Sequence, residues 1–352
     1  MSTLKVTNIE SPSGGGVNAK ITDINGGQLS NRNLIINGAM QVSQRGTSHS
    51  FAHDGTAAGY TLDRMSFVTA NLESFDGTVT QSTDAPAGFS NSWKLTTGTA
   101  EAAIDANDIA YVQLPLEAQN LQLLQYGAAS AQTFTLSFYV KASITGTYGC
   151  TFYQADALRN RTATYTINTA DTWEFKTITL TGDASGTINN DNGAGLQVAW
   201  NFATGSDWDS TDSTSWGAFV NSRWGFGHAQ DGVITTANAT WQITGVQLEV
   251  GDVATAFEHR SYGDELAKCQ RYYQDGTYFQ TDGNGPVTVH FIREMRAAPV
   301  MAVTASTAIT GAAAGTAHYT GASTGNTATE FTVYNPGGSN VIGCTYTANA
   351  EL

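Results

Sequence analysis

Several short stretches of the chain alternate between hydrophobic and polar residues, and this pattern constrains the fold more than any other feature. In TFTLSFYVK, Phe134, Leu136 and Phe138 have one parity and Tyr139 has the other. The stretch LQVAWNF, residues 196–202, repeats the alternation. A period of two places successive side chains on opposite faces of a β-strand, so each stretch predicts a strand with one buried face.

The composition favours β-structure over exposed helices. Hydrophobic residues make up 41% of the 352 residues and charged residues 13%, whereas globular proteins have roughly 25% charged residues. Thr, Ser, Asn and Gln must therefore supply most of the polar surface, which suits strands and turns. Short strands separated by polar loops favour two packed sheets over βαβ units. We predict an all-β fold with a two-sheet sandwich over residues 33–260.

The stretch TWQITGVQLEV changes parity in its middle. Trp241 and Ile243 share one face, whereas Val246 and Leu248 have the opposite parity. A strand keeps one buried face through such a change only where an extra residue is inserted. Gly245 stands at the change, so we predict a β-bulge, or a bend with the same effect, at that residue.

The residues after the sandwich change to helical spacing. Ser261 suits an N-cap, while Asp264 and Glu265 place carboxylates in the first turn, where the helix dipole favours negative charge. We predict one short linker helix over residues 261–276. Alternating residues within 277–352 then predict a small C-terminal β domain, and its low charge suggests strands that pack against copies of themselves.

Residues 1–32 are predicted to form an extended N-terminal arm. Leu4, Val6 and Ile9 could dock against another surface, but the run SPSGGG interrupts any regular element. We interpret the arm as an attachment peptide anchored by these three residues. The alternative is an arm that folds on its own domain.

Charge and cysteine usage exclude several classes of function. The net charge is −14, and the 16 Lys and Arg residues are scattered, which argues against nucleic acid because phosphate binding requires clustered basic residues. The N-terminal sequence lacks a secretory signal, and no stretch of about 18 apolar residues could span a membrane. We expect synthesis in a cytoplasm, with Cys150, Cys269 and Cys344 as free thiols in cores.

Signals for an enzyme are weak. The sequence has no phosphate-loop or Gly-x-Ser-x-Gly pattern and no histidines at metal-binding spacing, so we expect neither catalysis nor a cofactor. Glu249 and Glu258 could form a carboxylate pair for glycoside cleavage; in the favoured alternative, Glu258 anchors the linker to the sandwich. Asp207, Asp209 and Asp212 could ligate calcium, or they form a solvated acidic loop. The sequence does not decide whether the protein binds a metal ion.

Trp208 and Trp216 are the residues that we assign to glycan binding. They lie among Ser, Thr, Asp and Gly, where a rigid indole could stack on a sugar. Asp207 and Asp209 would bond the sugar hydroxyls. The alternative is that both rings cap the edge of the sandwich or a seam between subunits. Trp200, in contrast, lies within an alternating stretch and is predicted to belong to the core.

Eight segments resemble bacteriophage tail-fibre and related virion proteins. They are NLIINGAM (33–40), QRG (44–46), YTLDR (60–64), TGVQLEVG (244–251), ATAFE (254–258), CQRYY (269–273), MRAAP (295–299) and AEL (350–352). Those proteins usually have a tryptophan where this chain has Met65 and a proline where it has Ala256. The two differences concern local packing. The resemblance implies a jelly-roll sandwich similar to carbohydrate-binding modules, a homotrimer, and an N-terminal arm that grips the virion.

The residues and the resemblance together suggest a non-enzymatic virion protein, a trimeric tail fibre that attaches to the host surface. Its expected partners are virion proteins of the tail or of a portal/adaptor complex, further copies of itself, and host-surface polysaccharide. The second hypothesis is a head fibre, decoration or tail adaptor without a receptor role. The third is a polysaccharide depolymerase, which no repeated β-helix pattern supports.

Overall fold

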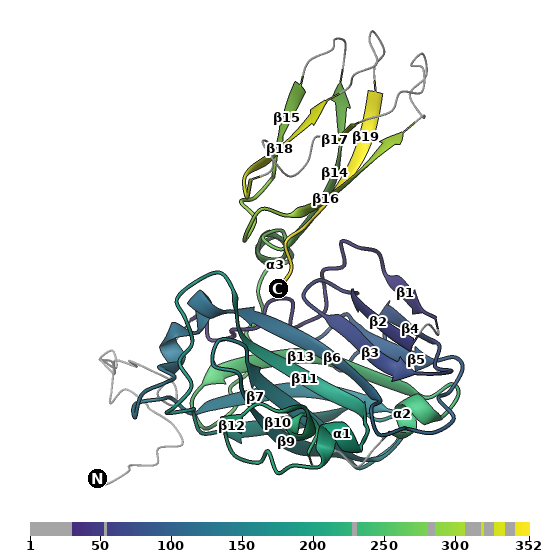
Figure 1. Ribbon diagram of the computed structural model, residues 1–352, viewed down its shortest axis with the longest axis vertical. Coiled ribbons are helices and arrows are strands. Elements are labelled where there is room, and N and C mark those ends of the chain that lie inside the picture. Colours follow the sequence, from purple (N-terminus) through teal and green to yellow (C-terminus); the bar gives the residue numbers. More distant parts are fainter. Residues whose placement is uncertain are drawn as a thin grey trace, which may run out of the picture.

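The chain forms a large β-sandwich, a short helix and a smaller β domain, in that order (Figure 1). The computed structural model describes residues 30–52, 55–226, 231–280, 286–306, 318–319, 327–334 and 342–352. The assigned anchoring residues Leu4, Val6 and Ile9, and most of the predicted arm 1–32, lie outside the described residues. The fold is all-β with a jelly-roll sandwich, as expected.

Two antiparallel sheets make up the sandwich. The six-stranded sheet has the order β1-β4-β5-β13-β7-β10. Its strands are β1 (Ser48–Phe51), β4 (Gly77–Ser82), β5 (Ser92–Thr97), β13 (Thr240–Val250), β7 (Phe134–Ala142) and β10 (Glu174–Leu180). The seven-stranded sheet has the order β12-β9-β8-β11-β6-β3-β2. Its strands are β12 (Gly217–Ala218), β9 (Arg159–Ile167), β8 (Gly146–Gln154), β11 (Ala194–Thr204), β6 (Ile109–Glu117), β3 (Ser66–Leu72) and β2 (Gly55–Tyr60).

The alternating stretches form strands with the predicted faces buried between the sheets. Phe134, Leu136 and Phe138 on β7 are fully buried, and so is Trp200 on β11. Tyr139, of opposite parity, is half-buried on the outer face. Burial of these large apolar side chains stabilises the contact between the two sheets. The core of the sandwich is therefore the one that the sequence pattern predicts.

Two of the three cysteines are buried free thiols, as predicted. Cys150 lies on β8 and Cys269 at the end of the helix after the sandwich, and both are fully buried. The side chain of Cys344 lies outside the described part of the chain.

The predicted bulge at Gly245 is confirmed. The residue has a φ of 62°, a left-handed conformation that suits glycine. The register between β13 and β7 shifts between Thr244 and Gln247. Trp241 before the shift and Leu248 after it are both fully buried. One inserted residue thus keeps both halves of the strand facing the core.

The helix after the sandwich, α3 (Tyr262–Cys269), begins as predicted but ends early. Ser261 is its N-cap, because its hydroxyl accepts a hydrogen bond from the backbone N–H of Asp264 at 3.2 Å. The linker helix was predicted over residues 261–276. Tyr273 instead starts a strand and pairs with Asn349, near the end of the chain.

The remaining helical elements of the described chain are short. They are η1 (Ala118–Leu124), α1 (Ser206–Asp209), η2 (Asn221–Arg223) and α2 (Gly232–Thr235). A helix with the length and apolar character needed to cross a membrane was not found in the ranges that the structure describes.

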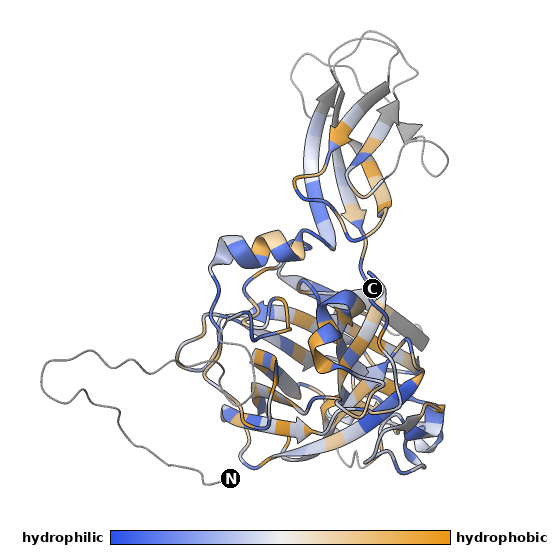
Figure 2. Cartoon of the chain, turned by 90° about the vertical axis from the view of Figure 1, so that its left-hand side faces the viewer, coloured by the Kyte–Doolittle hydropathy of each residue, from blue (hydrophilic) through white to orange (hydrophobic). Residues whose placement is uncertain are grey.

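The C-terminal domain consists of two three-stranded sheets, β14-β19-β16 and β15-β18-β17. Their strands are β14 (Tyr273–Gln280), β15 (Pro286–His290), β16 (Val300–Ser306), β17 (His318–Tyr319), β18 (Glu330–Tyr334) and β19 (Ile342–Asn349). Phe331 is fully buried between them, with the rings of Phe291 and Tyr346 at 5.5 and 4.8 Å. Figure 2 shows α3 lying between this domain and the sandwich.

The last residues of the chain return to the sandwich beside α3 (Figure 1). Buried Arg64 forms an ion pair with Glu351, and its guanidinium lies 3.5 Å from the centre of the Tyr272 ring. The hydroxyl of Tyr60 donates to the carbonyl oxygen of Leu352 at 2.7 Å. The C-terminal domain is therefore held to the sandwich at both of its ends.

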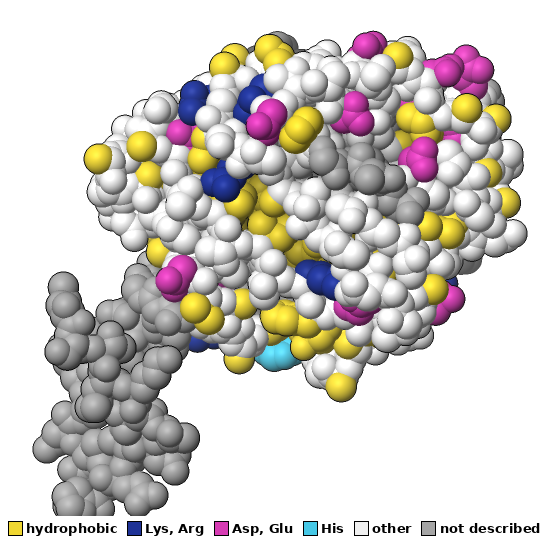
Figure 3. Space-filling model, turned by 90° about the horizontal axis from the view of Figure 1, so that it is seen from below, with side chains coloured by type: hydrophobic (Ala, Val, Ile, Leu, Met, Phe, Trp, Pro, Cys, Tyr) yellow, Lys and Arg dark blue, Asp and Glu magenta, His cyan; other side chains and the backbone are white. Residues whose placement is uncertain are grey.

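The face of the molecule seen in Figure 3 carries few charges. On the face seen from below, acidic and basic side chains are scattered, and hydrophobic side chains gather near the centre (Figure 3). This distribution agrees with a chain in which only 13% of the residues are charged.

Candidate functional site

Trp208, assigned to glycan binding from the sequence, lies in α1 outside the seven-stranded sheet. It is half-buried, and its indole N–H donates to the carbonyl oxygen of Asn107 at 2.9 Å. Its ring packs on a cluster formed by Ile109, Ala199 and Trp224. These contacts match the alternative in which the ring caps the sandwich.

Trp216 occupies a different place. Its indole N–H donates to the carbonyl oxygen of Thr181 at 2.9 Å, and its ring meets that of Tyr126 edge-on at 5.8 Å. Trp216 packs against the main core, whereas Trp208 packs against the separate cluster under α1. The structure does not unite the two indoles in one surface. Their role in glycan binding stays a prediction.

The three aspartates near Trp208 do not converge. Asp207 is exposed, and Asp209 is half-buried, where desolvation raises its pKa. Asp212 accepts hydrogen bonds from the backbone N–H and the hydroxyl of Thr214, both at 2.8 Å. Within the described ranges, no three His, Cys, Asp or Glu side chains group in a way that could hold a metal ion.

Glu249 and Glu258 both serve the structure around the bulged strand. Glu249 is buried and accepts hydrogen bonds from the backbone N–H and hydroxyl of Thr255 at 2.8 and 2.6 Å. Glu258 accepts from the backbone N–H groups of Arg32 and Asn33 at 3.2 and 3.0 Å. Glu258 thus anchors the segment after the sandwich to the residues that begin it.

A line of aromatic side chains crosses the outer face of the six-stranded sheet. Tyr139 on β7 lies opposite Phe175 on β10, with ring centroids 5.0 Å apart. Phe89, from the loop between β4 and β5, is 5.5 Å from Tyr139, and Phe257 is 5.0 Å from Phe89. Phe175 is 49% exposed and the other three rings are half-buried. These four residues are named the aromatic platform.

Gly245 makes room for the aromatic platform. A β-carbon at this position would lie 2.7 Å from Cζ of Phe89 and 3.1 Å from Cδ2 of Tyr139. The missing side chain lets both rings lie directly on the bulged strand. The bulge therefore positions the platform as well as correcting the register of β13.

Charged groups border one end of the platform. Asp84 accepts hydrogen bonds from the ammonium of Lys141 at 2.5 Å and from the indole N–H of Trp173 at 3.2 Å. Desolvation acts to raise the pKa of Asp84, but hydrogen bonds, first that from Lys141, outweigh it and lower the pKa. The carboxylate is therefore ionised at neutral pH, and 44% of its side chain is exposed.

This arrangement has the chemistry of a saccharide site. Aromatic faces stack on the apolar faces of sugar rings, and nearby charged or polar groups bond the hydroxyls. Trp173, directly before β10, bonds Asp84 and lies two residues from Phe175, so the aromatic row extends toward Asp84. An open row of this kind can hold a chain of sugars without enclosing it.

The sequence held a signal for part of the platform. The outward parity of Tyr139 was visible in TFTLSFYVK, and Phe175 has the outward parity of its own strand. Their meeting depends on the pairing of β7 with β10, and Phe89 and Phe257 arrive from loops. Alternation within one strand cannot supply those contacts.

Comparisons with known proteins found likenesses of structure only. No protein-family model and no curated protein sequence matches the chain. The enzymatically active domain of tailspike protein 4 from bacteriophage CBA120 is 12% identical, with a TM-score of 0.34. The match covers 62% of this chain and 21% of the tailspike chain, so the chain matches about a fifth of that protein.

Carbohydrate-binding modules are also among the similar structures. The family 11 module from Clostridium thermocellum, in complex with a β-1,3-1,4-mixed-linked tetrasaccharide, is 10% identical with a TM-score of 0.27. That match covers 60% of this chain and 91% of the module. The xylan-binding domain from Paenibacillus barcinonensis is 12% identical with a TM-score of 0.26, covering 63% of this chain and 96% of the domain.

Proposed function

We propose that this protein is a bacteriophage virion component, a trimeric tail fibre whose sandwich attaches to host-surface polysaccharide through the aromatic platform. The observation that carries the polysaccharide part is the platform, a row of partly exposed rings beside the ionised carboxylate of Asp84. The virion part rests on the segments that resemble tail-fibre proteins, from NLIINGAM to the terminal AEL.

Attachment without cleavage is the form of this function that the site favours. The platform is open, and weak contacts on it would be multiplied by the copies in a trimer and on a virion. Glu249 and Glu258, the carboxylates weighed for glycoside cleavage, are both held by structural hydrogen bonds. A depolymerase would need a different carboxylate pair.

Binding of purified protein to polysaccharide extracted from host cells tests the proposal. Phe175→Ala removes the most exposed ring of the platform and should weaken binding about tenfold, the equivalent of about 1.4 kcal/mol. Val220→Ala is the matched control, because Val220 is 50% exposed but lies outside the platform, before η2. Equal binding by both variants and the wild type would exclude the platform as the site.

The position on the particle has its own test. An antibody against the C-terminal β domain should label tail fibres in electron micrographs of intact virions. Label on the head would instead favour the head fibre or decoration, and label at the head–tail joint the adaptor. If the fibre is a homotrimer, sedimentation of the purified protein should give a mass of three chains.

A further inference from the structure

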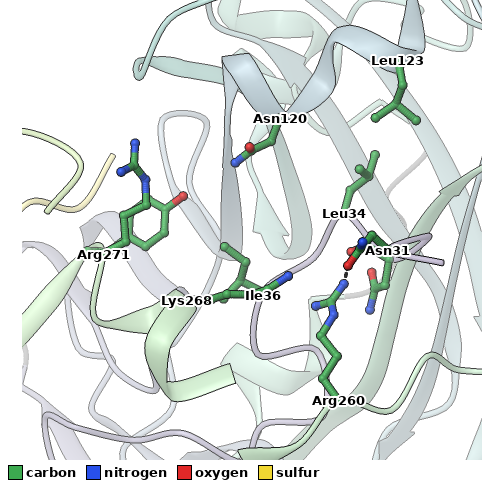
Figure 4. A pocket seen from close by; sticks show the side chains of 10 residues that line it. Asn31, Leu34, Ile36, Asn120, Leu123, Arg260, Lys268 and Arg271 are labelled. Carbon is green, nitrogen blue, oxygen red and sulfur yellow. Dashed lines mark hydrogen bonds between the residues drawn. The ribbon is translucent and has the colours of Figure 1, made fainter. Parts of the chain in front are cut away.

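Two adjoining cavities lie where the sandwich meets α3. Figure 4 shows the first, lined from residues 31–36, from η1 and from the segment that contains α3. Its volume is about 380 Å³ and that of the second is about 620 Å³. The cavities share Asn31, Arg260 and Lys268. Both volumes suit small ligands, and the pair is named the junction groove.

The first cavity of the junction groove is lined by basic residues although the protein is acidic. Arg260, Lys268 and Arg271 line the first cavity, whereas the second adds Arg293 together with Glu258 and Asp264. The whole chain has 16 Lys and Arg residues and a net charge of −14. The described residues that line the first cavity include no Asp or Glu. The first cavity is therefore the part of the groove that is suited to an anion.

Lys268 is a cation of the first cavity with unused bonding capacity. Its half-buried side chain has no hydrogen bond or ion pair with any part of the chain that the structure describes. Desolvation, followed by the charge of Arg260, lowers the pKa of Lys268. Arg260 itself is committed to Glu258 and Glu265 at 3.1 and 2.8 Å. A carboxylate arriving beside Lys268 would supply the missing partner.

The other walls of the first cavity suit a sugar ring. Asn31 and Asn120 are exposed amides, able to bond hydroxyl groups. Leu34 and Ile36 form an apolar wall against which ring carbons can pack. Figure 4 shows Asn120 and Lys268 projecting into the same space from opposite sides.

The junction groove is continuous with the aromatic platform. The exposed ring of His259 is 4.8 Å from Phe257 and 5.3 Å from Phe89, and the same residue lines the second cavity. A polymer that crosses the platform can therefore enter the groove without leaving the surface. This continuity favours a saccharide over an acidic peptide as the occupant.

We infer that the junction groove binds the carboxylate groups of an acidic polysaccharide, such as a polymer containing uronic acid. Lys268 pairs with the carboxylate, and Asn120 bonds a hydroxyl of the same sugar. The inference rests on the proposed function, since one polysaccharide would occupy both the platform and the groove.

Calorimetric titration of the full chain with tetrasaccharides of galacturonate, hyaluronan and alginate tests this inference. At least one should bind, while its carboxyl-reduced counterpart should not. Lys268→Gln should weaken binding about tenfold and Asn120→Ala about threefold, as expected for a charge-assisted and a neutral hydrogen bond. Arg161→Gln removes one positive charge from β9, in the seven-stranded sheet, and is the control, expected to bind like the wild type.

The outcomes separate this inference from the proposed function. If none of the three tetrasaccharides binds, or if Lys268→Gln and Asn120→Ala bind like the wild type, the inference is overturned. Equal weakening by Arg161→Gln also overturns it, because diffuse charge would then explain the binding. The proposed function survives these results if Phe175→Ala still weakens binding of the host polysaccharide. Asn120 is exposed on η1, so its variant remains informative if Lys268→Gln unfolds the protein.

Discussion

Arg64 and Glu351 form a buried ion pair that joins the two β domains across 287 residues of sequence. Their side chains are 1% and 3% exposed. Arg64 also donates to the carbonyl oxygen of Pro115 at 2.5 Å, and its guanidinium stacks on Tyr272. Both ends of the C-terminal domain thus meet at one buried cation, which fixes that domain on the sandwich.

Glu351→Ala should lower the free energy of unfolding by about 3 kcal/mol, because it leaves the charge of Arg64 buried without its anion. Urea unfolding followed by fluorescence measures the change. Glu330→Ala is the matched control, since Glu330 pairs with His290 and its side chain is 39% exposed. That variant should stay within about 0.5 kcal/mol of the wild type. Equal effects of the two variants would show that the pair does not hold the domains together.

Gly245→Ala should destabilise the protein and impair polysaccharide binding together. The φ of 62° is strained for alanine, and its β-carbon would displace Phe89 and Tyr139. We expect a loss of about 1–3 kcal/mol in the free energy of unfolding. Binding should fall at temperatures where the variant is still folded, because two platform rings have moved.

Gly263→Ala is the control for that substitution. Gly263 lies in α3, and a β-carbon there meets nothing within 4 Å. Alanine in a helix should raise stability by about 0.5–1 kcal/mol and leave binding unchanged. If Gly245→Ala behaved in the same way, the bulge would not support the platform.

The local features of the fold could be predicted from the sequence because their causes are local. Trp241 and Leu248 have opposite parity, so both can face the core from β13 only with the insertion at Gly245. The N-cap at Ser261 is likewise a matter of three neighbouring residues. In both cases the residues that determine the local structure are close together in the sequence.

Features that depend on distant contacts could not be predicted in the same way. Helical spacing continues through Tyr273, yet this residue joins β14 because Asn349 offers it a strand partner. The sequence also does not show that Trp208 bonds the carbonyl of Asn107 or that Trp216 bonds that of Thr181, whereas their assignment to glycan binding stays a prediction. The sequence neighbours of a residue do not reveal which loops will cover it.

Stability should fall as the pH drops below about 4.5, and Glu174 contributes to that loss. Its pKa is about 2, because hydrogen bonds, first that from Lys176 at 2.5 Å, outweigh the desolvation that acts to raise it. The pKa of Glu174 is lower in the folded protein than the value of 4.5 for the unfolded chain, so the ionised carboxylate stabilises the fold. This stabilisation is complete above pH 4.5 and is lost as the pH falls toward 2.

Urea unfolding of Glu174→Gln at pH 7 and pH 3 measures this contribution. The variant should lose less stability between the two pH values than the wild type does. Asp252→Asn, at an exposed carboxylate in the turn after β13, is the matched control. An unchanged pH dependence in Glu174→Gln would assign the acid sensitivity to other carboxylates.

Trp208→Phe and Trp216→Phe should each lower stability by about 1 kcal/mol, the usual worth of one hydrogen bond, without weakening polysaccharide binding. Each substitution keeps an aromatic ring but removes the indole N–H that bonds a backbone carbonyl. The decisive comparison is with Phe175→Ala, which should weaken binding while leaving stability nearly unchanged, since 49% of Phe175 is exposed. If Trp208→Phe or Trp216→Phe bound polysaccharide more weakly while keeping full stability, the binding site would lie at those tryptophans and not on the platform.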